Sequence, residues 1–276
     1  MEYEQDVARH YAQDALQRTI LRALVAAGKD IGQLVPADLA PVDEFHIGGR
    51  QATVDFAAQL ELKPEMKLLD IGSGLGGASR YFADEWDCRV AGIDLTKDYV
   101  EAAGMLAEYV GLGDKVSYQH GSALDLPHGA AHFDGAYMLH VGMNIEDKAK
   151  LFRGVRRVLK PGGFIGVYDV MREADGAMTF PLPWASSGET SFVESAATYR
   201  QLLEAAGFTV HKTRSRRDFA LDFFRQMQAR AAASAQPPLL GLHILMGETA
   251  SQKVANMVKL LEQGLLAPTE MIAQAV

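Results

Sequence analysis

The sequence contains very little cysteine and no cluster of metal ligands. Cys88 is the single cysteine among 276 residues, so an intrachain disulfide is excluded and a reducing compartment is predicted. No cysteine or histidine residues stand at the spacing of a zinc site. We therefore expect a protein without a bound metal.

Long apolar runs are also missing, which bears on where the protein works. No stretch approaches the roughly 18 apolar residues of a membrane span. The amino terminus, Met1 to Asp6, is acidic and is not followed by an apolar core of signal-peptide length. These features predict a cytoplasmic protein with no membrane partner.

An excess of positive charge is absent as well. The sequence has 35 acidic and 27 basic residues, which gives a formal net charge of −8 and an isoelectric point near 5.5. No overall field would attract nucleic acid to such a protein. The basic groups at 153–160 and 212–217 are interpreted as solvated surface. We expect no nucleic-acid partner.

The sequence does contain a regular alternation of strand and helix patterns. At 276 residues, one sizeable α/β domain with helical additions is favoured over two small domains. Alternation of this kind predicts a mostly parallel sheet covered on both faces by helices. The loop from Arg172 to about Ser195 is too long for a plain connection, and such loops often carry function. The predicted strands are 67–71, 89–94, 115–119, 133–138, 164–169 and 208–214, with a helical stretch over residues 6–34 and a helical tail from Asp218.

The first predicted strand ends in a carboxylate followed by a glycine turn. Gly72, Gly74 and Gly77 have the G-x-G-x-x-G spacing that lets a backbone turn tightly against a ligand. Asp70 stands two residues before the first glycine, where it would repel a cofactor diphosphate by roughly a few kcal/mol. A ligand with an ammonium and a sulfonium would be attracted instead. This interpretation favours S-adenosylmethionine, with a turn residue as the alternative role of Asp70.

A second carboxylate supports a nucleoside site. Asp94 ends the next predicted strand, 22 residues after Gly72, where it can accept hydrogen bonds from both ribose hydroxyls. NAD-binding proteins share this feature, so Asp94 alone does not choose between the cofactors. The alternative role of Asp94 is a helix N-cap before Thr96.

Several further motifs follow in order, and together they resemble the class I S-adenosylmethionine-dependent methyltransferases. The similarity covers about residues 45 to 215 and is greatest to the small-molecule branch with the ubiquinone/menaquinone, tocopherol and sarcosine/dimethylglycine methyltransferases. It implies a Rossmann-like α/β fold with a seven-stranded sheet whose last strand is antiparallel. The motifs that carry it are the glycine loop, Asp94, Gly121–Pro127, Phe133–Tyr137 and Arg157–Gly163, which includes a predicted turn at Lys160–Gly163.

The resemblance also implies a domain plan and a cofactor site. Residues 1–44 would form a helical lid, 45–215 the cofactor-binding domain with a substrate loop at 172–195, and 216–276 a helical extension. Ser122 departs from the aspartate common at this position, and its uncharged hydroxyl would hold the adenine less strongly. The implied cofactor contacts are Asp70 to the methionine ammonium, Gly72, Ser73 and Gly74 to the methionine portion, Asp94 to the ribose, Leu95, Ser122 and Ala123 to the adenine, and His140 and Tyr11 around the cofactor.

The candidate catalytic residues follow the later strands. His140 comes directly after the strand 133–138 and could act as a general base, or it could only orient the cofactor. Tyr168 ends the strand 164–169, where Asp169 could accept from a substrate amine or cap the next segment. Trp184 in the long loop could wall off the reaction or bind a cationic nitrogen, or simply plug the domain edge. His46 is a candidate of second rank.

These features together predict an enzyme that transfers a methyl group from S-adenosylmethionine to N, O or C of a small organic molecule, leaving S-adenosylhomocysteine. Methyl transfer is an in-line displacement, which chiefly requires alignment and exclusion of water. The alternatives are an NAD-dependent oxidoreductase and a non-catalytic cofactor-binding protein. The carboxyl-terminal helices could cover the cleft or form a homodimer.

Overall fold

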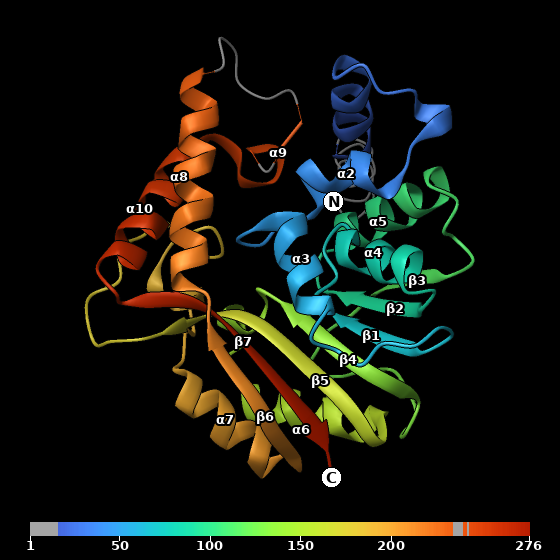
Figure 1. Cartoon of the computed structure of the whole chain (residues 1–276), viewed down its shortest axis with the longest axis vertical. Helices are drawn as coiled ribbons and strands as arrows, with labels where there is room; N and C mark the ends of the chain where they lie inside the picture. The colour runs from blue at the N-terminus through green and yellow to red at the C-terminus, as the bar shows by residue number, and fades with distance from the viewer. Residues whose placement is uncertain (1–15, 234–239, 242) are drawn as a thin grey trace, which may run out of the picture.

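The structure is a computed structural model that describes residues 16–233, 240–241 and 243–276. Its centre is one seven-stranded sheet in the order β3-β2-β1-β4-β5-β7-β6 (Figure 1). The pairs among β1 to β5 are parallel, and β7 runs antiparallel to β5 and β6. The mostly parallel sheet with an antiparallel strand is therefore confirmed. The strands are β1 Lys67–Ile71, β2 Arg89–Asp94, β3 Val116–His120, β4 Phe133–Leu139, β5 Leu159–Arg172, β6 Phe208–Ser215 and β7 Leu266–Ala275.

Helices cover both faces of the sheet, as the alternating pattern predicts. Apolar side chains of α6 and α7 fill the core on one face, and those of α3 and α4 fill it on the other. Residues 16–26 are also helical and pack with α2 and α5 in a separate apolar cluster. The described helices are η1 Ile31–Gln33, α2 Pro36–Asp43, α3 Gly49–Ala57, α4 Gly77–Glu85, α5 Lys97–Tyr109, η2 Gly142–Asn144, α6 Lys148–Val158, η3 Gly188–Thr190, α7 Ala196–Ala205, α8 Arg217–Ala233, α9 His243–Met246, η4 Gly247–Thr249 and α10 Ala250–Glu262.

The carboxyl-terminal segment differs from the predicted helical extension. Residues 217–233 and 243–262 are helical, but residues 266–275 form β7, which lies between β5 and β6. Almost all of β7 is buried, so it lacks the alternation of apolar and polar residues that reveals a half-exposed strand. Pro268 also argues against a central strand, because proline cannot donate to a ladder. The prediction of helix through residue 276 is wrong for this segment.

A second difference concerns the predicted turn at Lys160–Gly163. The structure includes this segment in β5, which begins at Leu159 and pairs with Phe133 of β4. The pairing shifts register between Phe133 and Gly135, where the extra residues are accommodated. The glycine-rich stretch is thus an irregular strand start rather than a separate turn.

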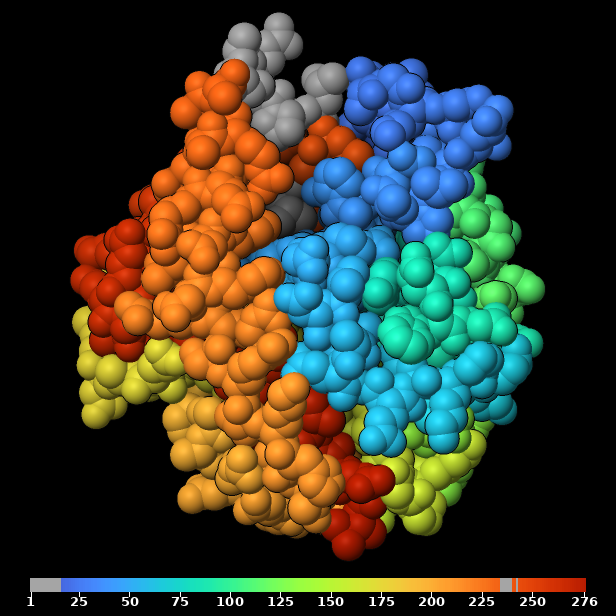
Figure 2. Space-filling model, viewed as in Figure 1, coloured from blue at the N-terminus to red at the C-terminus, as the bar shows by residue number. Residues whose placement is uncertain are grey.

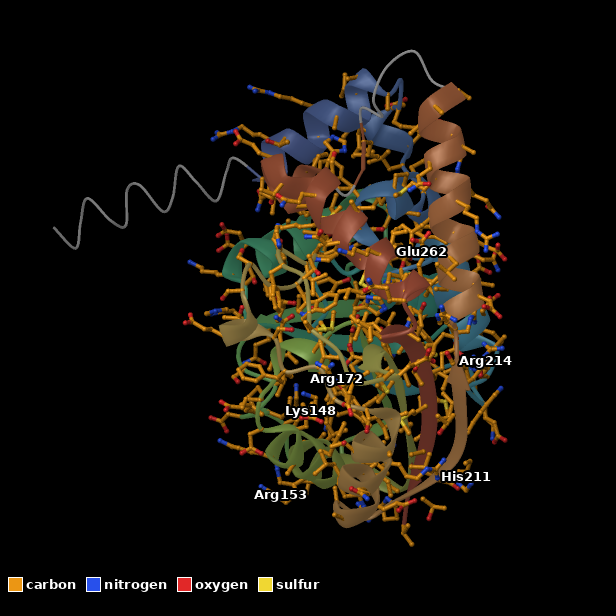
Figure 3. All side chains as sticks on the ribbon, turned by 90° about the vertical axis from the view of Figure 1, so that its left-hand side faces the viewer. Lys148, Arg153, Arg172, His211, Arg214 and Glu262 are labelled. Atoms are coloured by element: carbon orange, nitrogen blue, oxygen red, sulfur yellow. The ribbon has the colours of Figure 1, made fainter. Side chains whose placement is uncertain are left out.

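The last helices stand beyond the carboxyl ends of the parallel strands. Figure 1 shows α8 and α10 on one side of this region and α2 and α3 on the other. With all side chains drawn, Figure 3 shows α8 rising from the part of the sheet where Arg214 is labelled. Among the described residues, no helix combines the length and apolar character needed to cross a membrane.

Candidate active site

A large cavity opens at the carboxyl ends of β1, β2 and β4. Its volume is about 1800 Å³, and Gly72, Asp94 and His140, which follow or end these strands, all line it. The strand order reverses between β1 and β4, so the loops after them diverge and leave a crevice. This is the position where open α/β sheets bind ligands.

Asp70 lies in β1 and lines the cavity, with only 3% of its surface exposed. Its Oδ2 atom accepts a 2.6 Å hydrogen bond from the Ser79 hydroxyl. Burial raises the pKa of Asp70 to about 7, and the negative charges of Asp94 and Glu44 also act to raise it. The structure therefore places Asp70 in a strand rather than a turn. A cationic ligand beside it would stabilise the ionised carboxylate.

The glycine loop bends tightly and leaves open space above Gly74. Gly72 has a φ of +71°, and a Cβ atom built on it would lie 2.5 Å from Val141 Cγ2, so no larger residue fits. A Cβ atom at Gly74, with a φ of +52°, would meet nothing within 4 Å. The Ser73 hydroxyl is buried without a hydrogen-bond partner in the part of the chain that the structure describes. This backbone is open to a ligand, and the Ser73 hydroxyl needs a partner.

Asp94 braces the glycine loop. Its Oδ2 accepts a 2.8 Å hydrogen bond from the Gly74 amide, and its Oδ1 accepts one of 2.8 Å from the Thr96 amide. The N-cap residue of α5 is Thr96, so Asp94 is not the helix cap that the alternative interpretation required. Asp94 lines the cavity and each oxygen keeps a second lone pair for a ligand.

The predicted adenine contacts lie together on the same wall. Leu95, Ser122 and Ala123 all line the cavity. The Leu95 side chain is 75% exposed, which is unusual for leucine and leaves its apolar surface free to cover a ring. The Ser122 hydroxyl already accepts a 3.2 Å hydrogen bond from the Leu124 amide. The adenine role of these residues stays a prediction.

A buried ion-pair network, which the sequence did not reveal, joins the segment 43–50 to the glycine loop. The fully buried Arg80 guanidinium donates to the Leu75 carbonyl at 2.7 Å and to Asp43 Oδ2 at 2.5 Å. Glu44, also buried, pairs with Arg50 at 2.8 Å. A Cβ atom on Gly77 would lie 2.6 Å from the Asp43 carbonyl oxygen, so the two segments are in close contact. No local sequence pattern predicts these two pairs. Asp43 and Arg80 are 37 residues apart, Glu44 and Arg50 are 6 residues apart, and the members of each pair belong to different segments.

His140 is held in a fixed and unusual conformation at the cavity wall. Its φ is +57°, and its backbone amide donates a 2.7 Å hydrogen bond to the Tyr168 carbonyl. The ring Nε2 atom is buried and has no hydrogen-bond partner among the described residues. Burial, and secondarily the nearby His46, hold the pKa of His140 well below its usual value. The ring is therefore a neutral imidazole at neutral pH.

His46 faces His140 but is already satisfied. Their ring centroids are 6.0 Å apart. The His46 Nε2 atom lies 3.1 Å from the Gly49 carbonyl oxygen and 3.0 Å from the Thr53 hydroxyl. Burial lowers the pKa of His46 to about 4. These contacts favour a structural role for His46 in the segment 43–50.

Tyr168 does not line the cavity. It is 1% exposed, and its hydroxyl donates a 2.9 Å hydrogen bond to the Ile47 carbonyl. Its ring centroid lies 4.9 Å from that of His140. Tyr168 thus positions His140 and the segment 43–50, and its predicted catalytic role is replaced by this one. Tyr11 lies outside the described residues.

The remaining candidates divide between the cavity and the interior. Trp184 lines the cavity, and its Nε1 atom donates to the Ser191 hydroxyl at 3.0 Å. Asn144 donates to the Trp184 carbonyl at 2.9 Å, so its side chain holds the long loop in place. Asp169 is fully buried and accepts a 2.7 Å hydrogen bond from the Tyr199 hydroxyl, so it is removed from the cavity.

The far wall of the cavity comes from segments for which the sequence predicted no site residue except Trp184, and most of its side chains are apolar. Phe219, Phe223 and Met227 repeat every four residues along α8, a spacing that puts them on one face of the helix. This spacing was the available sequence signal. Phe219 also meets Gly48, where a Cβ atom would lie 2.4 Å from the ring, so α8 and α3 are in contact (Figure 2). We call this region the apolar chamber, lined by Trp184, Phe192, Phe219, Phe223, Met227 and Val254.

The comparisons with known proteins were made on sequence and on structure. The family described as a methyltransferase domain matches residues 69–167. The chain is 32% identical to phosphoethanolamine N-methyltransferase 1 of Arabidopsis thaliana over 59% of this chain and 32% of that protein. It is 26% identical to the O-methyltransferase resE of Aspergillus sclerotiorum over 82% of this chain and 83% of that protein. The chain spans about a third of the length of the plant phosphoethanolamine N-methyltransferases that it matches.

A solved structure shares the fold along almost the whole chain. Geranyl diphosphate C-methyltransferase from Streptomyces coelicolor A3(2), in complex with Mg²⁺, geranyl-S-thiolodiphosphate and S-adenosyl-L-homocysteine, superimposes with a TM-score of 0.68 at 16% identity. The similarity covers 96% of this chain and 98% of that one. Across residues 16–233, 240–241 and 243–276 of the present chain, no three histidine, cysteine, aspartate or glutamate residues are grouped to hold a metal ion.

Proposed function

We propose that this chain, which belongs to the class I S-adenosylmethionine-dependent methyltransferases, transfers the methyl group of S-adenosylmethionine to N, O or C of a small organic molecule. The observation that carries the proposal is the buried Asp70 carboxylate at the cavity wall. Its raised pKa means that burial in the protein disfavours the negative charge. A cation bound there makes the charge favourable, whereas a diphosphate would make it worse.

The residues present fit the cofactor. Bound S-adenosylmethionine supplies an electrophilic methyl group on a positively charged sulfur. Asp70 would hold the ammonium, and the Ser73 hydroxyl, which has no partner in the described structure, would meet the methionine portion beside Gly74. Asp94 would accept from the ribose, while Leu95, Ser122 and Ala123 would surround the adenine.

His140 is the candidate general base. Its Nε2 atom is buried at the cavity wall and has no hydrogen-bond partner among the described residues, and its fixed backbone holds the ring in place. A neutral imidazole can accept a proton from the attacking group as the methyl group is transferred. Tyr168, whose hydroxyl bonds to the Ile47 carbonyl, would position this ring, and the contact of the segment 43–50 with α8 would shield the cavity from water.

The rest of the plan is also proposed. Residues 1–44 would act as the lid and 45–215 as the cofactor-binding domain with the loop 172–195, while the helices of the extension 216–276 would build the acceptor side. A cytoplasmic location and a homodimer stay predictions. The oxidoreductase alternative has no support, because none of the relatives named above is an oxidoreductase.

Isothermal titration of the full chain tests the cofactor. S-adenosylmethionine and S-adenosylhomocysteine should each bind saturably, and NAD should not. Binding of NAD in preference to the sulfonium compound would overturn the proposal. Release of S-adenosylhomocysteine with a panel of hydroxyl, amine and carbon acceptors, followed by mass spectrometry, separates an enzyme from a non-catalytic binding protein.

A further inference from the structure

We propose that the methyl acceptor is a bulky, uncharged, largely apolar molecule that presents a hydroxyl group to His140 and occupies the apolar chamber. This inference rests on the proposed function and narrows its substrate class. Four features of the described residues carry it: the size of the cavity, the side chains of its far wall, the pairing of its charges, and the unpartnered nitrogen of His140.

The cavity is large enough for two molecules. Its volume of about 1800 Å³ exceeds the roughly 300–1,000 Å³ of an ordinary ligand pocket. The cofactor residues occupy one side of it, from Asp70 to Ala123, and the apolar chamber occupies the other. A compact polar acceptor such as a modified glycine would leave most of the chamber unfilled.

The walls of the chamber suit an apolar ring system. Phe219, Phe223 and Met227 line it from α8, and Val254 lines it from α10. Trp184 and Phe192 line it from the loop before α7. All six are only partly buried, so they keep apolar surface that a ligand can cover. Aromatic and aliphatic walls of this kind favour a ligand that is itself mostly apolar.

The charges around the cavity argue against an ionic acceptor. Among its described lining residues, the positively charged side chains are Arg50 and Arg230. Arg50 is paired with Glu44, and Arg230 is exposed, with its Nε donating to the Gln226 carbonyl of its own helix. A phosphate or carboxylate in the chamber would therefore lose its water without gaining a free cation.

An ammonium group on the acceptor finds no better partner. Asp43 is paired with the buried Arg80 and Glu44 with the partly exposed Arg50, while Asp70 and Asp94 lie on the cofactor side. Asp222, Glu146 and Asp147 also line the cavity, but all three are exposed to water. Asp222 pairs with Arg225 at 3.1 Å, and Asp147 accepts a 2.8 Å hydrogen bond from the Lys150 amide. An uncharged acceptor avoids the cost of burying an unpaired ion.

The unpartnered Nε2 atom of His140 can accept a hydrogen bond from a ligand. A hydroxyl group on the acceptor would donate to Nε2 and remove its unpaired state. During transfer, the hydroxyl proton would pass to Nε2 while the acceptor oxygen forms its bond to the methyl carbon. The carbon–sulfur bond breaks with its electron pair on sulfur, and the proton later leaves His140 for solvent.

This order of events also keeps the charge of the site constant. The positive charge on sulfur disappears as the imidazole becomes positive, so the buried site carries one such charge before and after the step. The low proton affinity of the buried ring is thus offset by the loss of the sulfonium charge.

The test uses 1-hydroxypyrene, a bulky fluorescent molecule with one hydroxyl group, on the full chain saturated with S-adenosylhomocysteine. It should bind saturably, and pyrene itself about two- to tenfold more weakly because the hydrogen bond is lost. Phosphoethanolamine and dimethylglycine should not bind at millimolar concentration. With S-adenosylmethionine, mass spectrometry should detect 1-methoxypyrene.

A matched pair of variants locates the binding. Phe223→Lys puts a charge in the chamber and should abolish 1-hydroxypyrene binding without changing S-adenosylhomocysteine affinity. Ala229→Lys adds the same charge at an exposed position of α8 outside the cavity lining and should change neither. Met227→Lys replaces the first variant if that variant does not fold.

The outcomes separate the two proposals. Failure of S-adenosylhomocysteine to bind overturns the proposed function itself. If S-adenosylhomocysteine binds, the inference on the acceptor is overturned when phosphoethanolamine or dimethylglycine is bound or methylated in preference to 1-hydroxypyrene. It is overturned equally when 1-hydroxypyrene does not saturate the protein, or when Phe223→Lys binds it as well as the wild-type chain does.

Discussion

The two sides of the cavity are built in different ways. The cofactor side consists of strand ends and tight loops from one continuous stretch, with the buried carboxylate of Asp70 at its centre. The apolar chamber is assembled from α8, α10 and the long loop, which are far apart in the sequence. The first side is polar and closely braced, whereas the second is mostly apolar. The cofactor side can therefore stay fixed while the chamber determines which acceptor is bound.

His140 lies where the two sides meet, and its removal should have the largest effect. His140→Ala should lower turnover about 10²- to 10⁴-fold, since a general base is lost, while cofactor affinity changes little. Steady-state kinetics and titration of S-adenosylhomocysteine measure the two quantities. His211→Ala, on the exposed part of β6, serves as the control (Figure 3). An equal loss in both quantities would make His140 a binding residue.

The buried Asp43–Arg80 ion pair, which joins the segment 43–50 to the glycine loop, can be broken separately. Asp43→Asn leaves the Arg80 guanidinium buried without its negative partner and should lower the free energy of unfolding by about 3–5 kcal/mol. Urea denaturation measures the loss. Asp38→Asn breaks a surface pair with Lys29 and should cost no more than about 1 kcal/mol. Similar losses in the two variants would contradict the role of the buried pair.

Asp70 tests the polarity of the cofactor side directly. Asp70→Asn preserves the shape of the side chain but removes its charge, and it should weaken S-adenosylmethionine binding by about 1–3 kcal/mol. Binding of 1-hydroxypyrene to the chamber should change much less. Asp84→Asn, at an exposed position of α4, is the matched control. Unchanged cofactor affinity in Asp70→Asn would refute the assigned role.

The raised pKa of Asp70 gives a smaller effect with a definite sign. Without ligand, Asp70 is ionised above about pH 7 and becomes protonated below it. A bound cation favours the ionised form, so below pH 7 binding must release a proton. The affinity for S-adenosylmethionine should then fall by up to about tenfold per pH unit, and it should be flat above pH 7. Titrations between pH 6 and 8 measure this, and Asp70→Asn should abolish the slope.

The contrast between the two sides also sets what the sequence could predict. The glycine loop, Asp70 and Asp94 were accessible because their spacing is local and is imposed by one strand-turn-helix unit. The parallel strands could also be predicted from the sequence, because their patterns are local. The positions of His140 and Trp184 at the cavity could be predicted from a strand end and from the length of the loop. The residues that contact and position these two side chains could not be predicted in this way.

The features that sequence reasoning missed depend on distant contacts. The strand β7 is buried on both faces and contains Pro268, so neither alternation nor propensity indicates it. The Asp43–Arg80 pair joins residues 37 positions apart. The Tyr168 hydroxyl donates to the Ile47 carbonyl, 121 positions away in the sequence. This contact gives the side chain a positioning role in place of the catalytic role that its strand end suggested. Only the folded chain brings such partners together.

The way in which the segment from α8 to α10 is attached to the sheet bears on how new activities could arise. These helices leave the sheet after Ser215 and return at Leu266, and Ser215 pairs with Thr269 in adjacent antiparallel strands. The Arg216 amide also donates to the Pro268 carbonyl at 2.7 Å, so the two attachment points are already tied to each other. A helical insert of different length or sequence could be transplanted between them with little strain on the ladder. Selectivity for acceptors would then be exchangeable as a single genetic unit.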